Sequence, residues 1–314
     1  MRPKAISSVA VLASVAGLVL AACGSESEPE GQPQESQSGQ SAPLYSELPE
    51  AIRSQGYLTL AGDSHPPYRT VQDDKKVTGI DPDFQKLLEG QLGVELRTEI
   101  TSGLPAILQG MMSGRYDAFN GPVRSTEERE QDFDSIVWMT TRSSYVFPVK
   151  NSKGIESSED LCGLRVAGTE GSVTETQVQR LNEWCSTEGK TPNEFIGLQD
   201  TNATVLAVQS DRADVLATTQ SAAIDLVDQR SGEFDYVTQT DEQGAGVDLM
   251  AMLTPKSTKL GPVLFKATEN LFGNGQYEAF MKQWGLEDVA IAEPLFNPAT
   301  QGSTSTPADF AEDK

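Results

Sequence analysis

Two arginines five residues apart and one glycine-containing turn carry the donors that an anion needs. Arg129 presents a planar fork of N–H groups that fits a carboxylate, and Arg124 adds a second positive charge nearby in the sequence. Gly171, Ser172 and Val173 open a predicted helix, where free backbone N–H groups attract negative charge. Arg129 could instead form a helical ion pair with a neighbouring glutamate, and Arg124 could face solvent. We therefore expect carboxylate binding, with these two alternatives open.

Metal and nucleophile chemistry find no support in the residue pattern. His65 is the single histidine, and no Cys or His spacing fits a zinc site. The sequence contains no nucleophile elbow and no phosphate-binding loop. Its formal net charge of −22 excludes nucleic acid as a partner. The residue pattern therefore gives no reason to expect a metal, a cofactor or an enzyme.

The first residues predict export and a lipid anchor. Arg2 and Lys4 form a basic start, and residues 5–22 carry no charge. The Leu-Ala-Ala sequence before Cys23 resembles the lipobox of bacterial lipoproteins, which implies removal of signal peptide 1–22 and diacylglycerol on the Cys23 thiol. We expect a protein held at the outer face of the cell membrane. A membrane-spanning run over residues 5–22 is the alternative.

The composition predicts flexible segments at the two ends of the mature chain. The residues between them are numerous enough to form two hydrophobic cores. Residues 24–43 consist mainly of Gly, Ser, Gln, Glu and Pro, so we expect a flexible tether over residues 23–47. Residues 295–314 are expected to form a flexible tail. Two cores are the default for a folded part of this length.

The remaining cysteines form an even pair once Cys23 is lipidated. Cys162 and Cys185 would then be exposed to an oxidising compartment, and we expect a disulfide between them. Two buried free thiols are the alternative.

Strand and helix patterns alternate along the middle of the chain. The fold class expected from this alternation is α/β with mainly parallel sheets. Asp117 and Asp214 occur in matching Ser-x-Arg-x-Asp patterns, each before a buried strand, and we expect both to shape the turn into the strand. The predicted strands are residues 57–61, 94–100, 116–120, 164–167 and 214–217, and the predicted helices are residues 81–93, 104–113, 172–184, 203–210, 223–230, 263–272 and 277–284.

At this point the order of short motifs resembles a known family. The motifs are Gly56-Tyr57-Leu58, Pro66-Pro67-Tyr68, Val77-Thr78-Gly79-Ile80-Asp81, the segment 110–117, Thr126-Glu127-Glu128-Arg129 and Gly171-Ser172-Val173. In this order they resemble the family 3, amino-acid-binding solute receptors of ABC importers. The resemblance covers residues 50–290.

The resemblance implies a two-lobed fold of the periplasmic-binding-protein type II, with a ligand cleft between the lobes. Two crossing hinge strands would lie near residues 145–149 and 249–253. Lobe 1 would comprise residues 48–147 and 250–294, and lobe 2 residues 148–249. The family further implies a monomer that captures an amino acid or related carboxylate and delivers it to an ABC permease in the membrane.

The family's site can be carried over residue by residue. Arg129 matches the carboxylate-binding arginine, Gly171, Ser172 and Val173 match the facing helix start, and Gly121 lies on the cleft wall. Tyr68 stands where the family places an aromatic side chain near the ligand, and His65 shares its loop. A surface loop with one anchoring tyrosine is the alternative for these two residues. Ser125 and Glu128 also fit a helical capping box.

Two departures from the family pattern affect the ligand. Thr218, Thr219 and Gln220 stand where family members carry the aspartate that holds an α-amino group, and Glu170, Asp63 or another carboxylate of the cleft could replace it. Arg124 stands where the family has a small hydroxyl residue, and a second arginine suits an additional anionic group.

Two other functions stay open on the same fold. The first is an exported lyase similar to cyclohexadienyl dehydratases, with a buried Glu170 as general acid. The second is a sensor lipoprotein that takes no part in transport.

Overall fold

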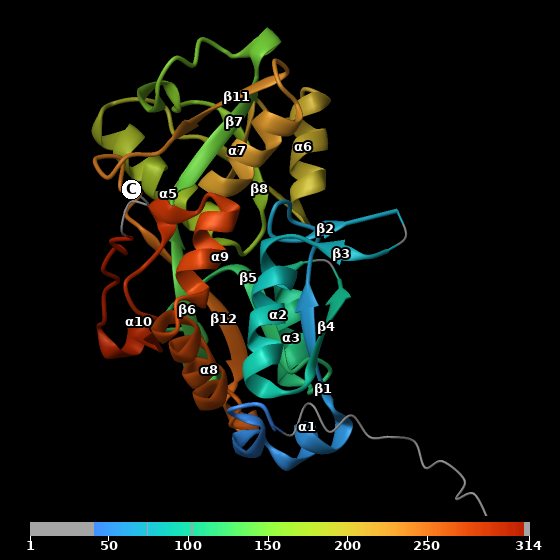
Figure 1. Cartoon of the computed structure of the whole chain (residues 1–314). Coiled ribbons are helices and arrows are strands. Elements are labelled where there is room, and N and C mark those ends of the chain that lie inside the picture. Colours follow the sequence, from blue (N-terminus) through green and yellow to red (C-terminus); the bar gives the residue numbers. More distant parts are fainter. Residues whose placement is uncertain (1–40, 74, 102, 311–314) are drawn as a thin grey trace, which may run out of the picture. The chain divides into compact units, whose positions relative to one another are not determined.

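The computed structural model describes residues 41–73, 75–101 and 103–310. The expected signal peptide 1–22, the expected lipidation site Cys23 and the expected tether as far as residue 40 lie outside these ranges. No helix within them is long and apolar enough to cross a membrane. The chain builds two larger sheets, and helices cover both faces of each (Figure 1). We call each sheet with its helices a lobe.

The first lobe is built on a mixed sheet with the strand order β13-β6-β12-β5-β1-β4. Strands β4 and β5 are parallel to β1, whereas β12 is antiparallel to β5 and β6. One face is covered by α2, α8 and α9, where Phe84 stacks on Trp138. The strands are β1 (Tyr57–Gly62), β4 (Glu95–Ile100), β5 (Ala118–Arg124), β6 (Phe133–Thr141), β12 (Asp248–Pro255) and β13 (Leu295–Phe296), and the helices are α1 (Glu50–Gln55), α2 (Ile80–Leu92), α3 (Leu104–Met112), α4 (Arg129–Asp132), α8 (Gly261–Gly273), α9 (Gln276–Trp284) and α10 (Pro298–Gln301).

The second lobe has the strand order β11-β7-β10-β8-β9. Helix α5 packs on one face of the sheet through Val178 and Leu181, and helices α6 and α7 cover the other through Ala207 and Ala223. The strands are β7 (Ser143–Pro148), β8 (Arg165–Thr169), β9 (Glu194–Leu198), β10 (Val215–Thr219) and β11 (Phe234–Thr238), and the helices are α5 (Val173–Thr187), α6 (Thr201–Gln209) and α7 (Gln220–Gln229). A small hairpin of β2 (Thr70–Val71) and β3 (Val77–Thr78) belongs to neither sheet.

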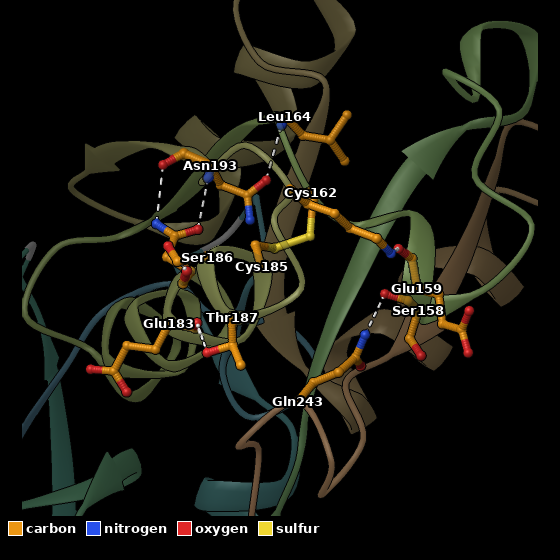
Figure 2. Close-up of a disulfide and its surroundings, with 12 residues drawn as sticks. Ser158, Glu159, Cys162, Leu164, Glu183, Cys185, Ser186, Thr187, Asn193 and Gln243 are labelled. Atoms are coloured by element: carbon orange, nitrogen blue, oxygen red, sulfur yellow. Dashed lines mark hydrogen bonds between the residues drawn. A yellow bond between two sulfur atoms is a disulfide. The ribbon is translucent and has the colours of Figure 1, made fainter.

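A disulfide joins Cys162 to Cys185 in α5, with the two Cα atoms 5.9 Å apart (Figure 2). This pairing confirms the prediction and excludes two free thiols. Close to the disulfide, the Gln243 side chain donates a hydrogen bond of 2.6 Å to the Ser158 carbonyl. The disulfide and this bond tie the segment before β8 to α5 and to the chain that returns from the second sheet.

The chain passes between the two sheets at two places. The first lies at Arg142, between β6 and β7, and the second falls between β11 and β12 at residues 239–247. The expected positions, residues 145–149 and 249–253, lie later in the chain, within β7 as far as residue 148 and within β12.

Both expected flexible ends are wrong for the residues that the structure describes. Leu44 and Leu48 are each 2% exposed and join the core of the first lobe, so no tether extends to residue 47. At the other end, the N–H of Ala292 donates to the Thr306 carbonyl at 2.8 Å, and Phe310 packs edge-on against Tyr277. Residues 295–310 are therefore attached to the first lobe.

Asp117 and Asp214 play matching roles in the two lobes. The Asp117 carboxylate accepts a bond of 2.8 Å from the N–H of Thr59 in β1, and the Asp214 carboxylate accepts one of 2.9 Å from the N–H of Arg165 in β8. Each aspartate thus fixes its turn to the neighbouring parallel strand, which agrees with the expected turn-shaping role.

Candidate functional site

Arg129 links the two lobes directly. It is the first residue of α4, and its Nη1 donates to the Arg124 carbonyl at 2.7 Å. Its Nη2 donates to the Gly171 carbonyl, in the opposite lobe, at 2.9 Å. Burial lowers the pKa of Arg129, with the positive charge of Arg124 acting in the same direction. The guanidinium therefore lies between the lobes, bonded to two neutral acceptors.

Two backbone donors at the helix start that faces Arg129, those of Gly171 and Ser172, are occupied. The N–H of Gly171 donates to the Glu175 carboxylate at 2.7 Å, and that of Ser172 donates to the Thr169 carbonyl at 3.2 Å. Val173 is the buried first residue of α5. A ligand carboxylate would have to displace Glu175 to reach the Gly171 amide.

The expected capping box at Ser125 and Glu128 is not formed. The N–H of Arg129 instead donates to the Thr126 hydroxyl at 3.2 Å, and the Ser125 hydroxyl bonds to Glu130. Glu130 also accepts 2.7 Å bonds from the backbone N–H and the hydroxyl of Thr300, so it holds α10 against α4. The predicted box was wrong because α4 begins only at Arg129, so Glu128 and not Ser125 is its N-cap residue.

Arg124 forms an ion pair at the hinge. Its Nε lies 3.1 Å from Oδ1 of Asp248, the first residue of β12. Gln177 of α5 donates to the other oxygen of Asp248 and also to the Ala245 carbonyl at 2.6 Å. Burial raises the pKa of Asp248, and the charge of Arg124 opposes this rise. This cluster joins the end of β5, the connection between β11 and β12, and helix α5 of the second lobe.

His65 and Tyr68 are buried rather than exposed on a surface loop. Nδ1 of His65 lies 2.9 Å from the Thr201 hydroxyl of the opposite lobe, whereas its Nε2 has no partner among the described residues. Burial lowers the pKa of His65 to about 4. Tyr68 is 1% exposed, and its hydroxyl lies beside Thr219 and Ser221 of the second lobe without a hydrogen bond of normal geometry. Both rings thus lie where the lobes meet.

Arg69 is a central residue that the sequence did not reveal. Its side chain is fully buried between two carboxylates, with Nη2 2.6 Å from Asp63 and Nη1 bonded to Asp81. A Cβ at Gly62 or Gly121 would lie within 2.5 Å of the Arg69 side chain. Gly121, expected to face the ligand, therefore makes room for Arg69. No local sequence signal marks this site, because the two glycines and the two acidic residues come together only in the folded lobe.

The two carboxylates around Arg69 respond differently to their surroundings. Burial favours the neutral form of both. For Asp63 the charge of Arg69 prevails and holds the pKa below its usual range. For Asp81 burial prevails and raises the pKa to about 7. Asp63 is thus an ion-pair partner inside the first lobe, and its proposed role as a counter-charge for a ligand would require competition with Arg69.

Thr219 and Glu170 lie at opposite extremes of burial. Thr219 is 1% exposed, and its hydroxyl accepts a bond of 3.3 Å from the N–H of Ala222 as the cap of α7. Glu170 is exposed. A general acid needs a desolvated carboxyl group to keep its proton at neutral pH, and Glu170 does not have that environment. Across the described residues, no three His, Cys, Asp or Glu side chains gather so as to hold a metal ion.

A hollow of about 350 Å³ opens beside Arg129. Its wall includes Leu104, Pro105 and Leu108 of α3 together with Gly171 of the second lobe. Glu128 and Asp132 also line this hollow, so both apolar and acidic side chains lie beside Arg129.

The chain is similar to known solute-binding proteins over most of its length. The arginine-binding protein ArgT of Corynebacterium glutamicum is 27% identical over 252 residues, which is 80% of this chain and 81% of that protein. The solved structure of the amino acid ABC transporter substrate-binding protein AbpA of Streptococcus pneumoniae, bound to L-arginine, superposes with a TM-score of 0.63 at 22% identity, covering 75% of this chain and 97% of that one.

A second solved structure is the ancestral amino-acid-binding protein AncCDT-1, described as a precursor of cyclohexadienyl dehydratase. It superposes with a TM-score of 0.62 at 20% identity and covers 75% of this chain and 98% of that one. At these identities both structures show the shared two-lobed α/β fold. The family model of bacterial extracellular solute-binding proteins, family 3, matches residues 58–287. This chain therefore belongs to the bacterial extracellular solute-binding proteins, family 3.

Proposed function

We propose that this chain binds a small carboxylate-bearing solute, an amino acid or a related compound, and delivers it to an ABC permease. The observation that carries the proposal is the position of the Arg129 guanidinium between the lobes. Its two donors meet neutral carbonyl oxygens of Arg124 and Gly171. A carboxylate is a stronger, bidentate acceptor for the same fork, so a ligand can replace these bonds.

The ligand would hold the lobes together through this replacement. A carboxylate on Arg129 lies next to the start of α5, where the Gly171 amide now donates to Glu175. If the ligand takes that amide as well, it bonds to both lobes at once. Hinge closure of this kind presents a new surface to a partner. A lyase activity is not proposed, because Glu170 is exposed.

The experiment begins with the purified protein and its own ligand. The protein is denatured, released small molecules are identified by mass spectrometry, and each candidate is titrated back by calorimetry, with L-arginine included because of the named relatives. Arg129→Gln should weaken binding of a carboxylate ligand by about 10- to 100-fold, because one charge-assisted fork is lost.

Arg97→Gln provides the matched control. Arg97 also pairs with a carboxylate, that of Glu95, but lies exposed on β4. Equal affinity of the Arg129→Gln variant and the control would contradict the proposed site. If no carboxylate compound binds the wild type, the proposed function itself fails.

The proposed location is the outer face of the membrane, with the monomer anchored through lipid on Cys23. The support is the lipobox-like sequence together with the extracellular family. A Cys23→Ala form should be released into the medium, since a lipid anchor needs the thiol. Retention of this form in membranes, measured by fractionation, would favour a membrane-spanning segment over the lipid anchor.

A further inference from the structure

The guanidinium of Arg124 is held at one end and unpaired at the other. Its Nε lies 3.1 Å from the Asp248 carboxylate, and the side chain is 25% exposed. Within the described ranges, Nη1 and Nη2 of Arg124 have no hydrogen-bond partner. These two nitrogen atoms form the part of the fork that binds planar anions best.

Asp248 lies on the Nε side of that fork as an ion-pair partner, and its Oδ1 accepts no hydrogen bond from the described residues. The Asp248 side chain is fully buried, and Gln177 of α5 holds its second oxygen. Because Asp248 takes the Nε side of the guanidinium, Nη1 and Nη2 remain for another acceptor. Arg124 is also next to the Arg129 site, since its own carbonyl accepts from Arg129. The positive charge of Arg124 also acts on Arg129, and the buried Asp248 carboxylate pairs with Arg124 alone.

Two carboxylates that could attract a cationic ligand group are already occupied. Asp63 and Asp81 both pair with the buried Arg69. At the position of the family's amino-group aspartate stands Thr219, whose uncharged hydroxyl caps α7. These three positions therefore provide no free negative charge for a cationic ligand group.

We infer that Arg124 is a second anion-binding group, and that the solute carries an acidic group for Arg124 in addition to the carboxylate bound by Arg129. This inference rests on the proposed function and narrows its ligand to dicarboxylates, including acidic amino acids. Asp248 is the positioning residue that orients the Arg124 fork. Arg69 pairs with Asp63 and Asp81, so these two carboxylates do not attract a cationic ligand group.

The test compares ligands that differ in charge but little in size. L-Glutamate, L-aspartate, L-glutamine and L-arginine are titrated into the full-length mature protein by calorimetry. The wild type should bind glutamate or aspartate at least about 10-fold more tightly than glutamine, because one charge-assisted interaction separates them. Arg124→Gln should remove this preference and leave glutamine affinity within about twofold. Arg124→Lys should keep part of it, since the charge remains without the fork.

Arg97→Gln again serves as the control and should keep the wild-type preference. The inference is overturned if the wild type binds glutamine or arginine as tightly as the acidic ligands, or if Arg124→Gln weakens all ligands alike. In either case the proposed function stands, because a carboxylate still binds. Failure of all four compounds, with no carboxylate released from the denatured protein, would overturn both proposals.

Discussion

At the scale of single residues, Arg69 holds two carboxylates that would otherwise be buried without a partner. Arg69→Met replaces arginine with an unbranched side chain that resembles its aliphatic part, and it removes the charge between Asp63 and Asp81. We expect a loss of about 3–5 kcal/mol in the free energy of unfolding, measured by urea denaturation, because breaking a buried ion pair leaves uncompensated charge. Adding Asp81→Asn to this variant should recover part of the loss. A single variant as stable as the wild type would show that the pairs contribute little.

His65 predicts a measurable pH dependence of stability. Burial lowers its pKa to about 4 from the usual 6.5, with the neighbouring Asp63 and Asp200 raising it and Arg69 lowering it further. Between these two values the unfolded chain binds a proton that the folded protein does not, so stability falls as the pH drops from 6.5 to 4. The full effect of His65 is about 3 kcal/mol.

His65→Gln tests this prediction, because glutamine cannot titrate and can still bond to Thr201. The quantity to compare is the difference in unfolding free energy between wild type and variant from pH 7 to pH 4. Asp81 titrates in the same window with the opposite sign, since its raised pKa favours the folded state at low pH. Both proteins carry Asp81, so the difference isolates the histidine. A difference that does not change with pH would contradict the lowered pKa.

The site shows which residues sequence reasoning can and cannot find. Arg129 and Tyr68 could be singled out because short motifs surround them. Arg69 could not, since an arginine beside a proline-rich loop reads as an exposed charge. Its burial depends on Gly62 and Gly121, which come from two different strands and leave space beside each other only in the folded sheet. Long-range complementarity of this kind is absent from any local pattern.

At the scale of elements, those with a local sequence signal were predicted, and strands without such a signal were missed. Helix α3 and strand β1 begin at the predicted residues because amphipathic spacing and turn residues mark them. Strand β6 was missed because all nine of its residues are buried, so no alternation signals a strand. The carboxylate of its residue Asp134 accepts from Lys256 and from the Asn297 amide, whereas the buried Ser135 hydroxyl has no hydrogen-bond partner among the described residues. The mixed pairing of the first sheet follows from this strand and β12.

The disulfide fixes α5, which carries the Gly171 turn at its start. Cys162 and Cys185 are 23 residues apart. Closing a loop of this length should stabilise the folded protein by about 3 kcal/mol in the chain-entropy model. Reduction of the wild type should therefore lower its unfolding midpoint, and the Cys162→Ala/Cys185→Ala variant should respond to no reductant. Equal midpoints of oxidised and reduced wild type would argue against this contribution.

At the scale of the whole molecule, contacts between the lobes set the equilibrium between open and closed forms. Asn202 at the start of α6 donates to the Ser64 hydroxyl of the first lobe at 3.2 Å. Removing this bond favours the open form. Apparent affinity falls with the fraction of binding-competent protein. Asn202→Ala should thus weaken ligand binding by about 2- to 10-fold, with a faster off-rate, although Asn202 belongs to no proposed ligand contact.

Asn270→Ala is the matched control for this last prediction. The Asn270 side chain also makes one amide hydrogen bond, of 3.1 Å to Gln91, but both residues belong to the first lobe. Its loss should therefore leave affinity and off-rate unchanged, even where it lowers stability. Stopped-flow release of the bound ligand separates the two cases. If both variants release ligand at the wild-type rate, the Asn202 contact does not hold the lobes closed, and closure depends on the ligand itself.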